Sequence, residues 1–435
     1  MLGRGIRGAA ALVGAGALLA LAGCASTSAA AVDIAAPLGA GKTVVFGAHA
    51  PLTGPLGPQW KRITGATRAW FDYVNSRGGV NGRTLEYRVR DDRADPAVAK
   101  TAVAKLVTQD SVFAMLGSAG SATHGAVAGY LADKKVPDLF IGSGDRRWND
   151  VETAPMRFGF APDTTIEAKV LATTLDRQYN GQTEVNGRIV STQYCAVVEK
   201  GVRGDEIMSG LRQVLGKNVV AEQRFSVTDT DLTAQVAALR AAGCQVNVVG
   251  GADVQTAAAI TAARASGYEA KWATPSLGGG ITTIADALPS SYGEYVNGLL
   301  TTTALPVSND DPWVKLFAEV NAQFGDGRPV DSDVIYGMSV GYAATEAVSE
   351  AGDPLSRKSL AAALEDGRVN GNGLLPLAYS TLSHAPYQGV GVVVAQDGAQ
   401  SILGRQVMLG SATGPKVVAY VGAPVPLARE GLPKG

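Results

Sequence analysis

The chain is poor in the residues that build metal and redox centres. It has three histidines and three cysteines among 435 residues. His49 and His124 have no cysteine or glutamate at the spacing of a metal-binding pair. We therefore expect neither a metal ion nor a cofactor.

An excess of positive charge is also missing. Lysine and arginine together number 38 and aspartate and glutamate 39, which gives a formal net charge of −1. When Arg4 and Arg7 are left out, because they lie in a segment that we expect to be removed, 36 basic side chains stand against 39 acidic ones, a charge of −3. No basic field is available to attract a polyanion, so the sequence argues against a nucleic-acid partner.

The N-terminal apolar run, residues 9–21, is too short to span a bilayer comfortably. It follows Arg4 and Arg7 and ends in Leu21-Ala22-Gly23-Cys24. A short basic region, an apolar run and small residues in this order are typical of a signal peptide.

The residues that close this segment resemble a bacterial lipobox, in which the cysteine is lipidated and the chain is cut directly before it. We expect residues 1–23 to be a lipoprotein signal peptide and Cys24 to carry the lipid. Residues 24–42 are small and nearly uncharged, as in a flexible tether. The mature protein would then be anchored at the outer face of the bacterial cell membrane. The alternative is a hydrophobic tail that contains a cysteine by chance.

Two cysteines remain for the body of the chain. Export would place Cys195 and Cys244 in an oxidising compartment, where disulfides persist. Each lies at the amino end of an expected strand, residues 194–198 and 246–249. Parallel strands that neighbour each other would bring the two thiols within bonding range. We predict a disulfide; the alternative is two small buried side chains.

Removal of 23 residues from 435 leaves 412, too many for one hydrophobic core. Short apolar runs alternate with helical patterns, which is typical of parallel α/β sheets. One helix is expected to begin with Asp95 as N-cap and Pro96 in the first turn. We predict two α/β lobes. The expected strands are residues 43–47, 85–89, 112–116, 139–141, 194–198, 219–224 and 246–250, and a strand near Trp272.

One stretch, residues 112–148, concentrates the features of a ligand site. Its two expected strands lead into loops of small residues, 117–121 and 142–144. In a parallel sheet both loops emerge at the carboxyl edge, where open α/β sheets bind ligands. We expect Ser121 and Thr123 to cap the crossover helix and the glycines to open backbone N–H groups, an arrangement suited to a carboxylate or other small anion. The alternative is two ordinary strand-to-helix turns.

Four short motifs follow one another in the first lobe: APLTGP at residues 50–55, VNSRGGVNGR at 74–83, RDDRADP at 90–96 and KVPDLF at 135–140. In this order they resemble the leucine/isoleucine/valine-binding family of type I periplasmic binding proteins, over residues 43 to about 398. The resemblance implies two flavodoxin-like lobes with parallel sheets flanked by helices, a three-crossing hinge and a ligand cleft between the lobes. It implies a non-enzymatic solute-binding protein, which we expect to be a monomer, that delivers a small ligand to an ABC transporter permease.

We place the three crossings near residues 160, 305 and 377. The expected parts are lobe 1 at residues 43–160 and 305–377, lobe 2 at residues 161–304 and 378–420, and a C-terminal tail at residues 421–435.

The resemblance also points to ligand-binding residues in the first lobe. Ser121 falls where the family uses a hydroxyl on the ligand carboxylate. Gly142 and Gly144 fall where a backbone group and a threonine hydroxyl serve, and Ser143 is the nearest hydroxyl that could replace the threonine. The family often has an aromatic wall near Gln59 or Trp60.

In the second lobe the resemblance points to Arg203, to Ala252 or Asp253, and to Ser276. Ser276 occupies the position at which amino-acid binders carry an acid for the ligand ammonium. A neutral hydroxyl cannot offset the desolvation of a buried charge, and only Asp253 could replace that acid. With Arg146, Arg147 and Arg203 expected near the mouth, these residues favour a small organic acid or other polar metabolite over leucine, isoleucine or valine. An amino acid remains the alternative.

A different class of protein must be weighed. Residues 337–341, GMSVG, match the nucleophile elbow of α/β-hydrolases, and Asp353 and His384 follow in the order of their triad. A secreted lipoprotein esterase with Ser339 as nucleophile is therefore a rival. Apolar residues recur at helical spacing through the motif, however, which places Ser339 in the middle of a helix. A ligand sensor of the same fold that feeds a regulator is a further alternative.

Overall fold

The computed structural model describes residues 33–432 with a few gaps. Cys24 and the predicted signal peptide lie outside the described residues, so the lipid anchor stays a prediction. Among the described residues no helix is both long enough and apolar enough to cross a bilayer. The gaps are residues 40, 181–182, 186–187 and 428.

The first sheet comes from the N-terminal part of the chain. Its five strands lie in the order β2-β1-β3-β4-β5, and all of them pair in parallel. This is the flavodoxin-like order, which reverses between β1 and β3 and opens a ligand crevice at the carboxyl ends of the strands. The strands are β1 (Val44–Ala50), β2 (Leu85–Asp91), β3 (Ala114–Leu116), β4 (Asp138–Ile141) and β5 (Arg157–Gly159).

The second sheet repeats this winding and then extends it. Strands β9-β8-β10-β11-β12 are parallel, and β13, β14 and β15 continue the sheet in antiparallel fashion. The predicted fold of two α/β lobes with parallel sheets is therefore confirmed. The strands are β8 (Tyr194–Glu199), β9 (Val219–Phe225), β10 (Val246–Gly250), β11 (Lys271–Thr274), β12 (Leu300–Thr303), β13 (Gly389–Gln396), β14 (Ala399–Gly410) and β15 (Val417–Ala419); a separate hairpin joins β6 (Thr183–Val185) to β7 (Arg188–Val190).

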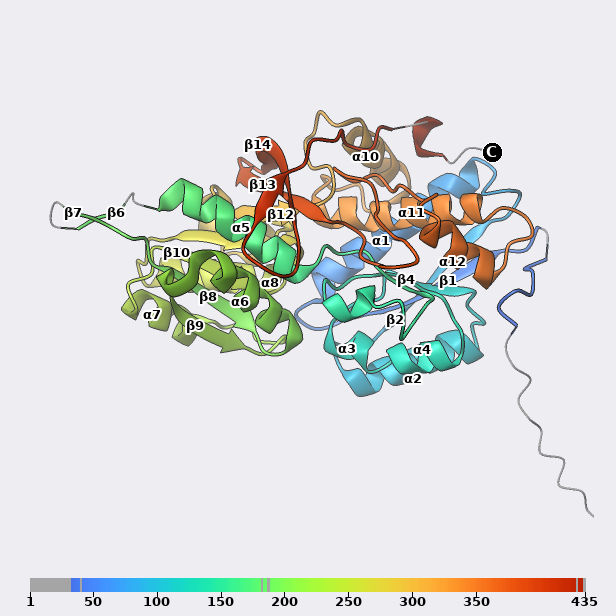
Figure 1. Cartoon of the computed structure of the whole chain (residues 1–435), viewed down its shortest axis with the longest axis horizontal. Helices are drawn as coiled ribbons and strands as arrows, with labels where there is room; N and C mark the ends of the chain where they lie inside the picture. The colour runs from blue at the N-terminus through green and yellow to red at the C-terminus, as the bar shows by residue number, and fades with distance from the viewer. Residues whose placement is uncertain (1–32, 40, 181–182, 186–187, 428, 433–435) are drawn as a thin grey trace, which may run out of the picture. The chain divides into compact units, whose positions relative to one another are not determined.

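Helices cover both faces of each sheet (Figure 1). Helices α1 and α11 pack on one face of the first sheet, and α2 and α4 on the other. Helices α5 and α6 pack on one face of the second sheet, and α7 and α8 on the other. The bounds are α1 (Gly57–Ser76), α2 (Pro96–Thr108), α3 (Ala122–Gly125), α4 (Ala128–Asp133), α5 (Thr164–Tyr179), α6 (Val202–Leu215), α7 (Thr233–Ala241), α8 (Asp253–Ala265), α9 (Ile281–Ala287), α10 (Pro312–Phe324), α11 (Ser332–Ala351) and α12 (Arg357–Glu365).

Helix α11 follows β12 in the chain but packs against α1 of the first lobe. Gly341 makes this approach close, because a Cβ atom there would lie 2.9 Å from Cβ of Trp70. Thr67 Oγ1 donates a hydrogen bond to the carbonyl oxygen of Gly337 (2.7 Å). Two glycines of the GMSVG motif thus serve helix packing, and burial of the Trp70 ring contributes on the order of 2 kcal/mol.

The crossover between β3 and β4 differs from the prediction. It is broken into two short helices, α3 and α4, and neither expected cap is made. Ser121 Oγ donates to Asp145 Oδ2 (2.5 Å), and Thr123 Oγ1 donates to the carbonyl oxygen of Ala119 (3.0 Å). The prediction of capping was wrong because both hydroxyls have other partners. At α2, in contrast, Asp95 caps the helix as predicted, accepting from the N–H of Ala97 (2.7 Å).

A disulfide joins Cys195 of β8 to Cys244, just before β10, with 5.8 Å between their Cα atoms. The two strands are parallel neighbours, and Cys195 pairs with Asn247. Both cysteines are buried among Val236, Leu239 and other residues of a core beneath α7 and α8. The bridge therefore ties the start of two adjacent strands.

A chain of buried polar side chains crosses the α2 face of the first sheet. Asp92 Oδ2 bonds His49 Nδ1 (2.7 Å), His49 Nε2 bonds His124 Nδ1 (3.1 Å), and His124 Nε2 bonds Asp138 Oδ2 (2.8 Å). All four residues are buried. Desolvation lowers the pKa of His49, while its bond to Asp92 acts in the opposite direction.

Candidate functional site

A cavity lies where the carboxyl ends of strands from both sheets meet. Loops after β4, β5 and β11 and residues of β12 form most of its wall, and α1 and α11 complete it. The polar residues of the wall are Gln59, Ser143, Thr164, Glu167, Arg203, Ser276, Thr301, Thr302, Thr303, Ser332, Asp333, Tyr336, Tyr387 and Gln400. Its apolar and glycine residues are Ile63, Gly142, Gly144, Phe160, Ala161, Pro162, Leu277, Gly279, Ala304, Leu305, Val307, Ile335 and Val393.

Five of the eight ligand residues expected from the sequence lie together in this wall. They are Gly142, Ser143, Gly144, Arg203 and Ser276. The three others, Trp60, Ser121 and Asp253, lie outside the wall.

The loop after β4 needs glycine because its backbone lies against other residues of the protein on both sides. A Cβ on Gly142 would lie 2.8 Å from the Trp60 ring, and one on Gly144 would collide with the carbonyl oxygen of Pro162. The N–H of Gly142 already donates to the carbonyl oxygen of Ser118 (2.8 Å), which corrects the expectation that it is open. The N–H groups of Ser143 and Gly144 make no hydrogen bond within the described residues.

Arg203 is the one basic side chain that the described residues contribute to the wall. It lies near the start of α6 and is buried. Its Nη2 donates to the carbonyl oxygen of Gly251 (3.2 Å), and Nη1 lies 3.5 Å from Glu199 Oε2. Burial raises the pKa of Glu199, and Arg203 opposes that shift.

Sequence reasoning missed Glu167. It lies one turn into α5, and its Oε1 accepts hydrogen bonds from the N–H of Ser276 (3.2 Å) and from Thr302 Oγ1 (2.7 Å). Burial raises the pKa of Glu167, and the bond from Thr302 opposes the shift. The only signal for this residue in the sequence is an acid on the buried face of an apolar helix. In the fold its carboxyl group lies beside Ser276, the position at which the resemblance implies an acid.

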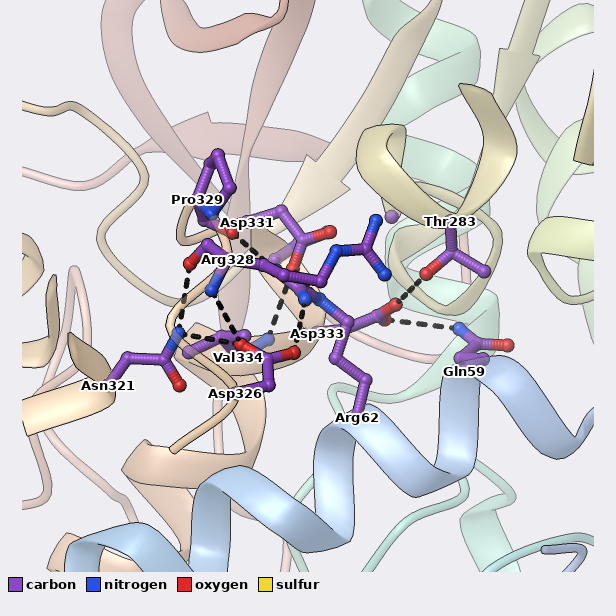
Figure 2. A network of polar contacts seen from close by, with 12 residues as sticks. Gln59, Arg62, Thr283, Asn321, Asp326, Arg328, Pro329, Asp331, Asp333 and Val334 are labelled. Atoms are coloured by element: carbon purple, nitrogen blue, oxygen red, sulfur yellow. Dashed lines mark hydrogen bonds and ion pairs between the residues drawn. The ribbon is translucent and has the colours of Figure 1, made fainter. Parts of the chain in front are cut away.

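Asp333 was missed as well. Figure 2 shows it between Gln59 of α1 and Thr283 of α9. Its Oδ2 accepts from Thr283 Oγ1 (2.8 Å) and its Oδ1 from Gln59 Nε2 (3.3 Å), which also donates to the carbonyl oxygen of Leu277 (2.8 Å). Burial, reinforced by Asp331, raises the pKa of Asp333 to about 7. These bonds join helices of the first sheet to segments of the second sheet directly.

Arg62 holds the segment before α11 in place (Figure 2). Its Nη1 pairs with Asp326 Oδ2 (2.6 Å) and its Nε with Asp331 Oδ1 (3.1 Å). Its remaining nitrogen donates to the carbonyl oxygen of Pro329. Each nitrogen of the buried guanidinium thus has a partner in the segment that leads into α11 and Asp333.

Asp253, the first residue of α8, is completely buried behind the wall. Its Oδ1 accepts from the N–H of Gly280 (2.8 Å), and a Cβ on Gly280 would collide with Oδ2 of both Asp253 and Asp333. Burial and the neighbouring Asp333 raise the pKa of Asp253 well above its usual range.

Ser121 and the two arginines after β4 form a cluster of their own. Asp145 Oδ2 accepts from Ser121 Oγ and pairs with Arg147 Nη2 (2.8 Å). The N–H of Arg146 donates to Glu206 Oε1 (3.2 Å) of α6, and Arg146 Nε lies 3.7 Å from Asp163 Oδ2. None of these side chains is among the cavity residues.

The residues of the rival hydrolase do not form a triad. Ser339 lies in the middle of α11, buried, and accepts a hydrogen bond from Asn372 Nδ2 (2.9 Å). Asp353 pairs with Arg83 (2.8 Å), and His384 bonds Glu365 Oε1 (3.2 Å). The helix that the periodicity predicted is confirmed. Within the described part of the chain, no three His, Cys, Asp or Glu side chains group as metal ligands.

Two lobes wound in the flavodoxin-like order, with one cavity at the carboxyl ends of both sheets, define a two-lobe binding protein. The model of the periplasmic binding protein family matches residues 43–400, and the chain belongs to this family. It is a solute-binding protein and not an enzyme, and the family places it outside the cytoplasm.

Similar proteins agree with this assignment. The leucine-, isoleucine-, valine-, threonine-, and alanine-binding protein of Pseudomonas aeruginosa is 25% identical over 291 residues, 63% of this chain and 74% of that protein. The structure of a fatty acid ABC transporter substrate-binding protein from Thermomonospora curvata has a TM-score of 0.70 at 22% identity and covers 86% of this chain and 95% of its own. A branched-chain amino acid ABC transporter from Thermus thermophilus with bound valine has a TM-score of 0.70 at 17% identity, covering 91% and 98%. The two structures show a shared fold.

Proposed function

We propose that this chain is a lipid-anchored solute-binding protein that captures a small carboxylate-bearing ligand, an amino acid or an organic acid, and delivers it to an ABC-type permease. The observation that carries the proposal is the cavity wall, in which the open N–H groups of Ser143 and Gly144 and the Arg203 guanidinium share one buried space. Backbone donors and a guanidinium suit a carboxylate. The amino acids and fatty acids in the names of similar proteins all carry this group.

We further propose that the crossings near residues 160, 305 and 377 act as a hinge between lobe 1 (residues 43–160 and 305–377) and lobe 2 (residues 161–304 and 378–420). A ligand that contacts both lobes favours the state in which they are closed. The radius of gyration from small-angle scattering should decrease when ligand is added. No change at saturating ligand would contradict the hinge.

Ligand binding can be tested by a thermal-shift screen of amino acids, organic acids and fatty acids. A ligand at ~100 times its dissociation constant adds about 2.7 kcal/mol to the stability of the folded state. We expect Arg203→Met to abolish this shift and Arg212→Met, an exposed arginine of the same helix, to preserve it. The proposal fails if no carboxylate stabilises the protein, or if Arg203→Met responds like the unmodified chain.

The anchor has a separate test, because it depends on Cys24 alone. The full-length chain, expressed in a bacterium, should be recovered from the membrane fraction with a lipid mass on Cys24. Cys24→Ser should remove that mass. A chain that reaches the membrane unlipidated would contradict the proposed anchor.

A further inference from the structure

The C-terminal segment leaves the second sheet and continues onto the first lobe. The N–H of Tyr420, directly after β15, donates to the carbonyl oxygen of Val407 in β14 (2.8 Å). Five residues later, the N–H of Val425 donates to the carbonyl oxygen of Gly373 (3.0 Å), and Trp313 Nε1 of α10 donates to the carbonyl oxygen of Val425 (2.9 Å). The segment therefore runs from β14 past α10 (Figure 1), a course that the three expected crossings do not include.

The end of this segment is seated against helices of the first lobe. Gly431 is buried, and a Cβ atom there would lie 2.7 Å from the Trp70 ring and 2.8 Å from the Leu316 side chain. Tyr73 Oη of α1 donates to the carbonyl oxygen of Glu430 (2.9 Å). Glu430 has a positive φ (56°), a conformation that costs energy in residues other than glycine and persists where the surrounding contacts determine it. The end of the segment is therefore held in a specific seat.

Between its two ends the segment lies on the surface. Residues 421–424 are exposed, and the Val421 side chain is 96% exposed. Pro424 and Pro426 restrict the backbone, so this stretch is a semi-rigid spacer and not a flexible linker. Five residues reach at most about 18 Å. We call residues 420–427 and 429–431 the strap, because they are fastened at both ends and exposed between them.

The strap is attached to the proposed hinge. Gly373, which accepts the hydrogen bond from Val425, lies between the second and third crossings. The N–H of the next residue, Leu374, donates to the carbonyl oxygen of Ala304 (2.7 Å), which directly follows β12 at the second crossing. The strap is thus a fourth connection between the two sheets.

We propose that the strap limits the opening of the two lobes and stabilises their closed arrangement. The inference rests on the proposed hinge, because it concerns motion about the same crossings. Opening breaks bonds between the lobes, such as that from Thr283 Oγ1 to Asp333 Oδ2 (2.8 Å), and moves β14 relative to α1. Because the strap spans these elements with a short, stiff stretch, a large opening must first break the bonds of Val425 or withdraw Gly431 from its seat. Either event loses packed contacts or a hydrogen bond, so the closed arrangement is favoured.

The test measures the distance between the lobes without any ligand. Strands β2 and β9 lie at the edges of their sheets farthest from the crossings, so the helices that follow them, α2 and α7, should separate most on opening. Ala97 and Ala234 are exposed second residues of these helices. Spin labels attached there through unnatural amino acids report the separation by double electron–electron resonance. Since no ligand is added, the result does not depend on the proposed ligand class.

The first variant releases the end of the strap. Gly431→Val should expel it, because the valine would collide with Trp70 and Leu316. Gly414→Val is the matched control, since Gly414 has the same φ (72°) and a Cβ atom there meets nothing within 4 Å. Brief trypsin digestion, with cleavage after Arg429 quantified by mass spectrometry, verifies that the end has left its seat. We expect the open population to be about fivefold or more higher in Gly431→Val than in the control.

A second pair of variants tests the attachment at the hinge. Val425→Pro removes the N–H that donates to Gly373 and keeps an extended backbone. The open population should rise by a smaller factor, because Trp313 still bonds the carbonyl oxygen of residue 425. Ala423→Pro is the control, since the N–H of Ala423 makes no hydrogen bond to a described residue.

The inference is overturned if Gly431→Val is cleaved rapidly after Arg429 and yet shows the same distances as Gly414→Val. If Gly431→Val does not fold, or is cleaved no faster than its control, Val425→Pro decides, and distances identical to those of Ala423→Pro overturn the strap. The hinge has its own test, because a radius of gyration that decreases with ligand would support a hinge of three crossings even then.

Discussion

The indole ring of Trp60 lies directly against the backbone of Gly142, so that a Cβ atom on Gly142 would stand 2.8 Å from Trp60 Cη2. Trp60 is 3% exposed and does not reach the cavity, whereas Gly142 forms part of its wall. The aromatic ring therefore supports the loop after β4 from behind. This contact limits how far the loop after β4 can move away from the cavity.

Gly142→Ala should push the loop towards the cavity. We expect a loss of about 1–3 kcal/mol in unfolding free energy from overpacking, together with weaker ligand binding. Denaturant titration and calorimetry measure the two effects. Gly129→Ala in α4, where a Cβ meets nothing within 4 Å, should be neutral or stabilising by up to about 1 kcal/mol. Trp60→Leu combined with Gly142→Ala should recover part of the loss, and an unaltered Gly142→Ala protein would show that the contact is not tight.

The pKa of Asp333 gives the stability of the fold a pH dependence. Its carboxyl group titrates near pH 7 in the folded chain and near 4 when unfolded, so the folded state binds the proton more tightly. The stabilisation is complete below pH ~4 and is lost as the pH rises through about 7, with a slope of at most about 1.4 kcal/mol per pH unit. Asp333→Asn should flatten this slope in urea titrations between pH 4.5 and 7.5. An identical slope in both proteins would contradict the assignment.

Ser339→Ala tests the structural role of the serine in α11. The variant leaves Asn372 Nδ2 without its buried partner and should lower the unfolding free energy by about 1–3 kcal/mol. Ligand affinity should stay unchanged, because Ser339 is not a cavity residue. The reading would be wrong if the purified protein hydrolysed nitrophenyl acetate and lost that activity on substitution.

The Cys195–Cys244 bridge should be measurable chemically and thermodynamically. Thiol titration of the unfolded, unreduced chain without Cys24 should find no free thiol. Replacement of both cysteines by alanine should cost about 2–4 kcal/mol of stability, mainly because the unfolded chain is then less constrained. Two titratable thiols in exported material would exclude the bond.

The sequence predicted those parts of the fold that depend on local pattern. Buried apolar runs located the parallel strands, and Asp95 with Pro96 located the start of α2, because strand burial and N-capping act over a few residues. The glycines of the loop after β4 were found for the same reason. Asp397 and Gly398, both with positive φ (50° and 75°), form the turn of the β13–β14 hairpin, and an Asp-Gly pair is a local signal for such a turn.

The rest of the site depends on contacts between distant parts of the chain. Gln59 and Asp333 meet across 274 positions, and Glu167 meets Thr302 across 135. No periodicity or motif carries such pairings. Ser121, expected at the ligand because of its place after β3, bonds Asp145, which lies 24 positions away on the loop after β4.

The polar chain from Asp92 through His49 and His124 to Asp138 has a consequence for charge. Its three hydrogen bonds in series need three protons, whereas two neutral imidazoles carry only two. To fill all three bonds at once, the chain would need one proton more than the two neutral imidazoles supply. These four polar side chains are buried beneath α2, among valine, leucine and methionine side chains. They can therefore exchange protons with bulk solvent only when the fold opens.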